Sequence, residues 1–389
     1  MSDAIVSRVA RAVHRQTRAR DTLERILGAA GIAIDGTAPW DIRVHDDRFF
    51  TRVLTLGTLG LGESYMDGWW DCPCLDEMTN RALRNDVDDE LIEWRDRLFV
   101  VWTRLRNLQT IGRARQVAQQ HYDLGNDFFA RMLGPTMTYS CAYWPTAQSL
   151  DEAQGAKMDL VARKLQLRPG DRVLDIGCGW GSMARFAAEH YGCDVVGITI
   201  SERQRDWAEQ HAKHRSTQIH VLDYRSTTLQ RLGPFDKIIS IGMLEHVGRR
   251  NYGVLFSVMQ SLLKEDGLLL LHSIFNEHSA VEPWLNRYIF PNGMLPSRRD
   301  VACAVDHKFV VEDEHNIGPD YDRTLMAWHE NLERHEREGN CPQFESERFR
   351  RMWRYYLLTC AGSFRAGTRN QVYQFVMSKR RRPDFIAVR

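Results

Sequence analysis

The sequence predicts an α/β protein in which a smaller, mainly helical N-terminal domain precedes a larger domain built on a doubly wound parallel sheet. Three observations support this fold class. The chain has 389 residues, which is long for one domain and suits two. From about residue 149 onward, short apolar runs alternate with helical stretches. The first of these runs ends in a turn rich in glycine, as such domains often have at their ligand site.

We expect the N-terminal domain at residues 1–106, a polar and basic linker at 107–120, and the larger domain at 121–389. In the N-terminal domain, apolar residues recur at helical spacing only over short stretches. These stretches are Thr22–Ala30, Phe49–Leu56 and Leu91–Leu105.

In the larger domain, Ser149 followed by Glu152 has the pattern of a capping box and predicts a helix that runs to about Leu165. A second helix should follow the glycine turn and end near His190. The predicted strands are continuous apolar runs, as expected for a sheet covered on both faces. They are Arg172–Ile176, Asp194–Thr199, Gln218–Leu222, Lys237–Ile241 and Leu268–Leu271.

Composition excludes several classes of protein. The chain carries 52 basic and 51 acidic residues, so it has no overall attraction to nucleic acid. No apolar run approaches the ~18 residues that a membrane span needs. The eight cysteines form no closely spaced framework, and Cys72 and Cys74 lack a second pair, so we expect no metal site. Scattered thiols and the lack of a signal peptide predict a cytoplasmic protein.

Charge is uneven near both ends of the sequence. The first twenty residues carry five arginines and one acid, with Val6, Val9 and Val13 at helical spacing. This segment is either a basic amphipathic helix that lies on an anionic membrane surface or a solvated terminus. The basic run Lys379–Arg382 leaves the same two alternatives open.

The turn after the first predicted strand is the most informative segment. The strand contains Asp175 near its end, and glycines follow at Gly177, Gly179 and Gly181. A strand that turns sharply into a helix leaves backbone N–H groups pointing outward, and glycine lets a ligand approach the main chain. The spacing is G-x-G-x-G, not the G-x-G-x-x-G of a dinucleotide site. It resembles the first motif of methyltransferases that use S-adenosylmethionine.

Ligands of such sheets bind beyond the carboxyl ends of the strands. The second strand ends at Thr199, and Ser201 and Gln204 follow it. No acid stands where a ribose-binding acid is usual, which disfavours a nicotinamide cofactor. Asp223 either accepts a hydrogen bond from an adenine amino group, with Tyr224 packed on the ring, or is an ordinary turn residue. Further candidates at strand ends are Asp175, Glu245, His246, His272 and Ile274.

Seven ordered motifs make the chain resemble the cyclopropane-fatty-acyl-phospholipid synthases and, more distantly, the mycolic acid cyclopropane synthases. The resemblance covers nearly the whole chain, including the segment Leu59–Trp70. The motifs are His121–Asp127, Tyr139–Trp144, Val173–Gly181, Thr199–Gln204, Met243–Gly248, Tyr288–Gly293 and Tyr321–Trp328.

The resemblance implies a Rossmann-like catalytic domain that transfers a methylene group from S-adenosylmethionine to a cis double bond of a phospholipid acyl chain. The residues at cofactor-binding positions of the family are Tyr139, Ser140, Gly177, Gly179, Gly181, Thr199, Ser201, Gln204 and Tyr224. The residues at positions where the family binds a bicarbonate ion are Cys141, Glu245, His272, Ile274 and Tyr321.

This chemistry needs positioning first, because an alkene has no proton that must be removed before it attacks a methyl sulfonium. The positive charge left on the chain needs an aromatic, water-poor pocket. The candidates for its lining, each of which could equally be ordinary core, are Tyr139, Tyr143, Trp144, Tyr288 and Phe290.

A weak base must then remove one proton, and bicarbonate suits this role. An ionised Glu245 would repel that anion, so we expect Glu245 to orient His272 or Tyr321, or to accept the bicarbonate hydroxyl. Cys141 lies in an apolar context that makes a thiol inert, so we expect no covalent catalysis by it. His246 is expected to be structural.

A lipid substrate implies that the protein docks reversibly on a phospholipid bilayer at the inner face of the cell membrane. A homodimer would strengthen such docking. Three alternatives remain: a methyltransferase without ring closure, an NAD-dependent oxidoreductase and a lipid-binding protein without catalysis. The glycine spacing argues against the second alternative, and the intact site residues argue against the other two.

Overall fold

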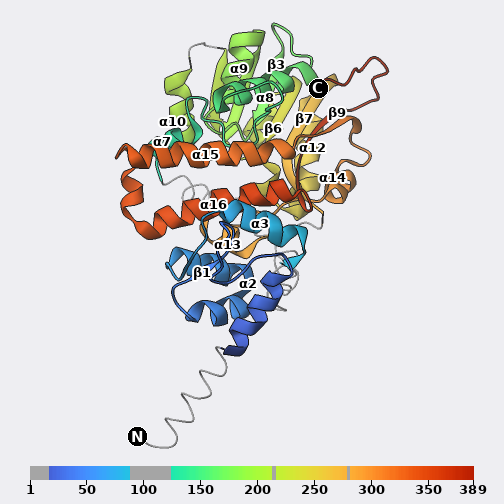
Figure 1. Cartoon of the computed structure of the whole chain (residues 1–389). Helices are drawn as coiled ribbons and strands as arrows, with labels where there is room; N and C mark the ends of the chain where they lie inside the picture. Colours follow the sequence, from blue (N-terminus) through green and yellow to red (C-terminus); the bar gives the residue numbers. More distant parts are fainter. Residues whose placement is uncertain (1–16, 88–123, 213–215, 278–280) are drawn as a thin grey trace, which may run out of the picture.

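The computed structural model describes residues 17–87, 124–212, 216–277 and 281–389. Helices near the N-terminus form one end of the molecule, the sheet forms the other end, and the long helices α15 and α16 lie between them (Figure 1). Several of the predictions concern residues outside the described ranges. They are the linker at 107–120 with the domain boundaries on either side of it, the stretch Leu91–Leu105 and the first sixteen residues. The proposed division into domains therefore stays a prediction.

The first described helix covers residues 17–28. The N-terminal elements after it are β1 (Arg43–Val44), α2 (Arg48–Met66), β2 (Trp70–Asp71) and α3 (Leu75–Arg84). The strands of the large sheet are β3 (Arg172–Ile176), β4 (Asp194–Thr199), β5 (Thr217–Val221), β6 (Phe235–Ile241), β7 (Leu263–Asn276), β8 (Val310–Asn316) and β9 (Asn370–Ser378).

Helices connect these strands. In chain order they are α7 (Asn126–Leu133), α8 (Leu150–Lys164), α9 (Ser182–Tyr191), α10 (Glu202–His211), α11 (Thr227–Leu232), η1 (Leu244–His246), η2 (Arg249–Asn251), α12 (Tyr252–Leu262), α13 (Pro283–Tyr288), α14 (Arg298–Val305), α15 (Pro319–Arg337), η3 (Pro342–Glu345) and α16 (Glu347–Ala366).

The seven-stranded sheet has the order β5-β4-β3-β6-β7-β9-β8. The strands from β3 to β7 run parallel, and all five predicted strands are present. β5 begins one residue earlier than predicted, and β7 is longer at both ends. The sheet is not wholly parallel, however, because β9 runs antiparallel to both β7 and β8. The prediction missed β8 and β9.

The polarity of β8 explains why it escaped prediction. It reads Val-Val-Glu-Asp-Glu-His-Asn, and most of its residues are not buried, because it lies at the edge of the sheet. Charged residues on an edge strand discourage pairing with another chain. They also remove the apolar run by which the parallel strands were recognised.

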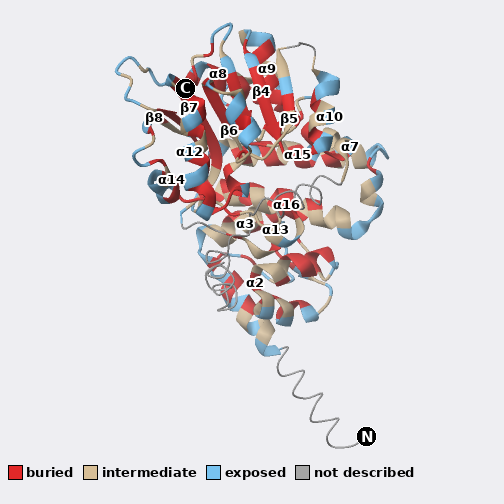
Figure 2. Ribbon diagram, turned by 180° about the vertical axis from the view of Figure 1, so that it is seen from behind, coloured by how far each residue is buried: buried red, intermediate tan, exposed pale blue. Residues whose placement is uncertain are grey.

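Alternate residues of the strands face two separate cores. On β7, Leu268 and Leu270 pack with α8 and α9, whereas Leu269 and Leu271 pack with α12 and α14. This alternation follows from the period of two in a strand. Figure 2 shows the strands buried and exposed residues on the outer helices. The α/β fold is therefore confirmed, with two strands added, of which β9 runs antiparallel to the rest of the sheet.

The predicted helix start at Ser149 is confirmed, but the capping box is not complete. The Ser149 side chain accepts a hydrogen bond from the Glu152 N–H. The Glu152 carboxylate accepts from the Gln148 N–H at 2.8 Å, one residue before the expected partner. Both bonds still satisfy backbone donors at the start of α8.

A third core joins the N-terminal helices to the rest of the molecule. It contains Phe49 and Trp70 from the N-terminal part and Phe128, Trp353 and Tyr356 from α7 and α16. Gly62 of α2 lies so close to the Trp284 ring of α13 that a Cβ would fall 2.4 Å from a ring carbon. The two parts thus share apolar packing and do not merely touch.

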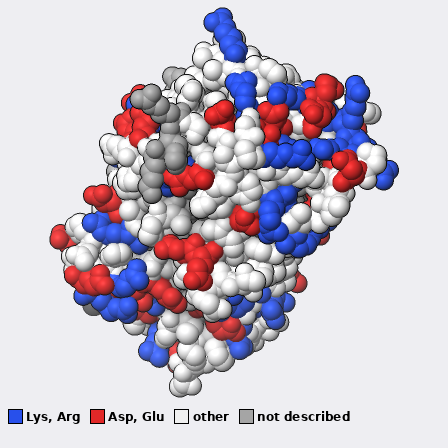
Figure 3. Space-filling model, turned by 90° about the horizontal axis from the view of Figure 1, so that it is seen from above, with Lys and Arg blue, Asp and Glu red and all other residues white. Residues whose placement is uncertain are grey.

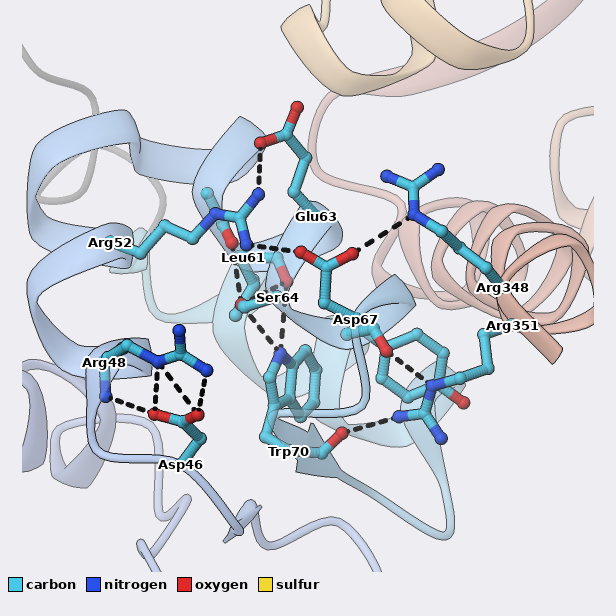
Figure 4. Close-up of polar contacts among 12 residues, drawn as sticks. Asp46, Arg48, Arg52, Leu61, Glu63, Ser64, Asp67, Trp70, Arg348 and Arg351 are labelled. Carbon is cyan, nitrogen blue, oxygen red and sulfur yellow. Dashed lines mark hydrogen bonds and ion pairs between the residues drawn. The ribbon is translucent and has the colours of Figure 1, made fainter.

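Ion pairs surround this shared core (Figure 4). Glu63 of α2 is buried, and its carboxylate contacts Arg52, Arg287 and the Tyr288 hydroxyl. Asp67 pairs with Arg52 and with Arg348 of α16. These contacts connect α2 with α13 and α16.

Arg351 of α16 also holds backbone of the N-terminal part. Its guanidinium donates to the carbonyl oxygens of Tyr65 and Trp70 and to the Asp71 carboxylate. The side chain is 12% exposed. A planar guanidinium presents five N–H donors in a rigid fork, so it can serve acceptors in fixed, separate directions better than a lysine can.

Charges are mixed on the end of the molecule that carries the sheet. Figure 3 shows Lys and Arg interspersed with Asp and Glu over that face. In the described residues, no helix combines the length and the apolar character needed to cross a membrane.

The contacts of Arg351 give a prediction about stability. Arg351→Met should lower the free energy of unfolding by about 2 kcal/mol, because it leaves partly buried carbonyl oxygens without a donor. Arg348→Met on the same helix is the matched control. Its side chain is 51% exposed, contacts one Asp67 carboxylate oxygen and lies 5.7 Å from the centre of the Tyr288 ring, so the loss should be smaller, about 0.5 kcal/mol. Urea unfolding measures both, and equal losses would contradict the role of Arg351.

Candidate active site

A cavity of about 1020 Å³ extends from the carboxyl ends of β3, β6 and β7 into the N-terminal helices. Its apolar end is lined by residues that include Leu23, Leu27, Ile42, Val53, Met78 and Ala82. Its other end is lined by most of the residues that the sequence predicted as a site. These are Tyr139, Ser140, Cys141, Asp175, Gly177, Gly179, Gln204, Glu245, His272, Ile274 and Tyr321.

The glycine turn is fixed by its own backbone. The amides of Gly177 and Cys178 donate to the Ile198 carbonyl, and the Gly181 amide donates to the Cys178 carbonyl. The expectation that these N–H groups point outward is therefore wrong for these three. Gly179 has a φ of +56°, and no atom lies within 4 Å of where its Cβ would be. It lines the cavity, so the main chain is open to a ligand at this point.

Thr199 and Ser201 act on the cavity through Gln204. The Thr199 hydroxyl donates to the Gln204 Oε1 at 2.6 Å, and the Ser201 side chain caps α10 by accepting from the Gln204 N–H. Neither Thr199 nor Ser201 is among the lining residues, whereas Gln204 is. The end of β4 thus orients one amide side chain toward the cavity.

Asp223 and Tyr224 lie away from the cavity lining, as Gly181 does. Both carboxylate oxygens of Asp223 contact the Arg225 guanidinium at 2.7 and 2.8 Å. Tyr224 is buried in the core that contains α12. Their predicted contact with an adenine ring stays a prediction, and an adenine amino group would have to share Asp223 with Arg225.

Lys157 is a site residue that the sequence reasoning missed. It is 1% exposed and donates from Nζ to the Ser140 hydroxyl at 2.9 Å. Burial lowers its pKa to about 8, partly offset by the nearby Cys141 and Asp175. A lysine in an amphipathic helix usually lies in solvent, so only the apolar neighbours of Lys157 in α8 could have signalled its burial.

Asp175 is the acidic counterpart of Lys157. Burial raises its pKa to about 7, and the charge of Lys157 opposes that rise. Its Oδ2 atom is buried with no hydrogen-bond partner among the described residues. A buried carboxylate oxygen without a donor is costly, so a ligand that donates a hydrogen bond at this point would be stabilised.

Glu245 does not contact His272 or Tyr321 through a hydrogen bond, contrary to one expectation. Its Oε1 accepts from the Ile274 N–H at 2.8 Å, and its Oε2 is buried without a partner in the described part of the chain. Burial raises the pKa of Glu245, against the effect of the Ile274 N–H. Glu245 therefore presents one free oxygen to the cavity in an environment that disfavours its charge.

The other titratable residues at this end of the cavity also have pKa values shifted in the direction that favours their neutral forms. Burial, helped by Lys157, holds the pKa of His272 well below its usual range. Burial raises the pKa of the Tyr321 hydroxyl and that of the Cys141 thiol well above their usual ranges. The high thiol pKa agrees with the expectation that Cys141 is inert.

Two of the five predicted aromatic residues line the cavity, namely Tyr139 and Phe290. Further lining rings were missed, among them Tyr356 of α16, whose hydroxyl lies 3.0 Å from that of Tyr139. His246 also lines the cavity, and burial lowers its pKa. Tyr143, Trp144 and Tyr288 lie elsewhere. Trp144, for example, donates to the Thr324 hydroxyl.

The environment of Asp175 predicts a pH effect on stability. Between about pH 4 and 7 the folded protein keeps a proton that the unfolded chain has lost, so this residue makes the wild type less stable as the pH rises. Asp175→Asn removes the effect, and its stability should improve relative to wild type across this window. Asp194→Asn, an exposed position on β4, is the control. Urea unfolding at several pH values measures the difference, and a constant difference would contradict the prediction.

The comparisons with known proteins agree with this geometry. A family model described as mycolic acid cyclopropane synthetase matches residues 81–375. The chain is 49% identical over 360 residues to the cyclopropane-fatty-acyl-phospholipid synthase of Escherichia coli (strain K12), which covers 91% of this chain and 92% of the relative. It is 37% identical over 270 residues to cyclopropane mycolic acid synthase 1 of Mycobacterium tuberculosis (strain ATCC 25618 / H37Rv), covering 64% of this chain and 92% of that protein.

Solved structures resemble the larger part of the chain. The cyclopropane synthase MmaA2 from Mycobacterium tuberculosis aligns with a TM-score of 0.61 and 34% identity, over 70% of this chain and all of that one. The mycolic acid cyclopropane synthase CmaA1 complexed with SAH and CTAB aligns with a TM-score of 0.61 and 35% identity, over 68% of this chain and 98% of that one. The chain therefore belongs to the mycolic acid cyclopropane synthetase family of S-adenosylmethionine-dependent methyltransferases.

Proposed function

We propose that this protein transfers a methylene group from S-adenosylmethionine to the cis double bond of unsaturated phospholipid acyl chains and forms cyclopropane fatty acyl phospholipids. The observation that carries the proposal is the shape of the cavity. It joins the glycine turn at β3 to an apolar end among the N-terminal helices. The relative from Escherichia coli, whose name states this activity, is similar over both parts of the chain.

The residues at the β3 end fit S-adenosylmethionine. Asp175 has an unpartnered buried oxygen for an ammonium group, and Lys157 places a cation nearby for a carboxylate. Gly179 leaves the main chain open, and Gln204 offers an amide to the cavity. When bound, S-adenosylmethionine supplies an electrophilic methyl carbon. The protein contributes by holding the reacting carbon and the double bond together.

The apolar end fits an acyl chain. Its lining comes from the helix at 17–28, from α2 and from α3, so the N-terminal part completes the binding site. Where the two ends meet, the rings of Tyr139, Phe290 and Tyr356 line the cavity. Aromatic faces stabilise positive charge that develops on the chain, and exclusion of water prevents its capture as an alcohol.

The residues around Glu245 fit a bicarbonate ion, which supplies a weak base when bound. The unpartnered Oε2 of Glu245 can accept a hydrogen bond from the bicarbonate hydroxyl, and burial, which raises the pKa of this carboxyl, disfavours the negative charge that would repel the anion. His272 and the Tyr321 hydroxyl line the same end and add polar groups. A further ionised carboxylate beside this position would repel the bicarbonate ion.

The substrate also implies reversible contact with a bilayer at the inner face of the cell membrane, and we propose such contact without a membrane span. Basic residues would contribute through anionic lipids, so binding to vesicles should weaken as salt rises. A homodimer stays a prediction.

The activity is tested with purified protein, unsaturated phospholipid vesicles, S-adenosylmethionine and bicarbonate. Mass spectrometry should show a gain of one CH₂ per modified acyl chain together with loss of the double bond. Removal of bicarbonate should slow the reaction. Transfer of a methyl group with the double bond retained, or transfer to another acceptor, would instead support a methyltransferase without ring closure.

Glu245 gives a sharper prediction. Glu245→Gln should lower turnover by about 100-fold, because the side chain acts on the proton removal, while the affinity for S-adenosylhomocysteine changes little. Calorimetry and initial rates measure the two quantities. Glu189→Gln, at an exposed position of α9, should change neither. Equal losses in turnover and affinity would overturn this assignment.

The apolar end of the cavity gives another prediction. Ala82 of α3 lines it, whereas Arg84 of the same helix is exposed and does not. Ala82→Trp should fill the space that the acyl chain needs, and activity on vesicles should fall at least about tenfold with S-adenosylhomocysteine affinity retained. Arg84→Trp, the control, should keep its activity. If Ala82→Trp is fully active, the acyl chain does not occupy this end.

A further inference from the structure

Three adjacent strands place three polar side chains level with one another. Gln374 of β9 is the register partner of His272 on β7 and also of His315 on β8. Cross-strand partners share one face of a sheet, so the three side chains form a row. Gln374 is completely buried, does not line the cavity, and was not among the residues predicted from the sequence.

The contact between Gln374 and His272 determines where the imidazole carries its proton. The Gln374 Nε2 lies 3.3 Å from the His272 Nδ1. With the amide in this orientation its nitrogen donates, so the Nδ1 atom accepts and carries no hydrogen, while the Gln374 Oε1 is buried without a partner among the described residues. Burial and the charges of Lys157 and Lys164 hold the pKa of His272 well below the usual range, which favours the neutral imidazole. Its single hydrogen is therefore on Nε2.

The next ring along the row has the same arrangement. Lys164 is fully buried, and its Nζ lies 3.0 Å from the His315 Nδ1. An ammonium group also only donates, so His315 accepts at Nδ1 as well. Lys164 is held in turn by Asp313, 3.5 Å away. Both histidines of the row therefore have a donor at Nδ1, which is Gln374 for His272 and Lys164 for His315.

We propose that Gln374 is a positioning residue that fixes His272 as the Nε2–H tautomer, so that the imidazole faces the cavity as a hydrogen-bond donor to a small anion. This inference rests on the proposed function, because bicarbonate is the anion that the proposed reaction needs. The opposite tautomer would direct a lone pair at the anion and repel it. His272 then binds the base and does not itself remove the proton.

The tautomer is measured directly by NMR on the full chain labelled with ¹⁵N-histidine. Long-range ¹H–¹⁵N correlations distinguish a protonated from an unprotonated ring nitrogen, and the signals of His272 are those lost in His272→Gln. The expected result for the wild type is a neutral ring with hydrogen on Nε2. A ring protonated on Nδ1 would overturn the proposal, whatever the activity of the enzyme.

Two variants test the role of Gln374. Gln374→Glu places an acceptor beside Nδ1, and the hydrogen should move to Nδ1. Gln374→Met keeps the size but removes the donor, and the half-saturating bicarbonate concentration should rise about tenfold, with a smaller change in turnover at saturating bicarbonate. Gln371→Met on the same strand lies on the other face and is the matched control, expected to keep the wild-type tautomer and bicarbonate response.

The outcomes separate this inference from the proposed function. One outcome is that the wild type has the Nε2–H tautomer and Gln374→Glu reverses it, while bicarbonate has no effect on any of the proteins. In that case bicarbonate is not the base of the proposed function, but Gln374 still determines the tautomer of His272. If Gln374→Met and Gln374→Glu both keep the wild-type tautomer and bicarbonate response, Gln374 does not position His272. The wild-type spectrum decides even where a variant fails to fold.

Discussion

The site depends on one constraint, the burial of titratable groups where water cannot solvate their charges. Burial raises the pKa of Asp175 and of Glu245 and lowers that of His272. Each shift favours the neutral form, so fewer isolated charges have to be buried. Lys157 adds a positive charge to the site. Its ammonium group donates to the Ser140 hydroxyl, and its charge acts on both Asp175 and His272. A reaction that develops positive charge on a hydrocarbon chain requires a site from which water is excluded. In such a site each remaining polar contact is also stronger than in water.

The dryness is produced by the way in which the N-terminal helices and α16 share a core. Neither the sheet nor the N-terminal part encloses the cavity alone, since its lining comes from both. Arg351 and Glu63 hold the two parts together through buried or partly buried hydrogen bonds, and these bonds have direction as well as strength. The position of the apolar end relative to the glycine turn is therefore determined in part by residues outside the cavity lining.

Much of this could be predicted from the sequence, for reasons that differ between elements. The parallel strands were recognisable because two covered faces require apolar runs, and the strand-end rule then brought Asp175, Glu245 and His272 to one edge. Lys157 and Gln374 could not be recognised in this way, because a polar residue in a helix or strand gives no sign of its burial until the packing is known. Glu245 lies at this edge as predicted, but the expected hydrogen bond to His272 or Tyr321 is replaced by one from the Ile274 N–H, since reasoning about side chains does not reveal a backbone donor.

The position of β9 has a consequence for synthesis. Residues 370–378 are translated after the other six strands of the sheet, yet they occupy an interior place between β7 and β8. A nascent chain that has already emerged as far as β8 still lacks the strand that pairs with both neighbours, and His272 still lacks its register partner. The complete sheet can therefore form only after β9 has been translated. A chain that stops before residue 370 cannot assemble the row of side chains that includes His272.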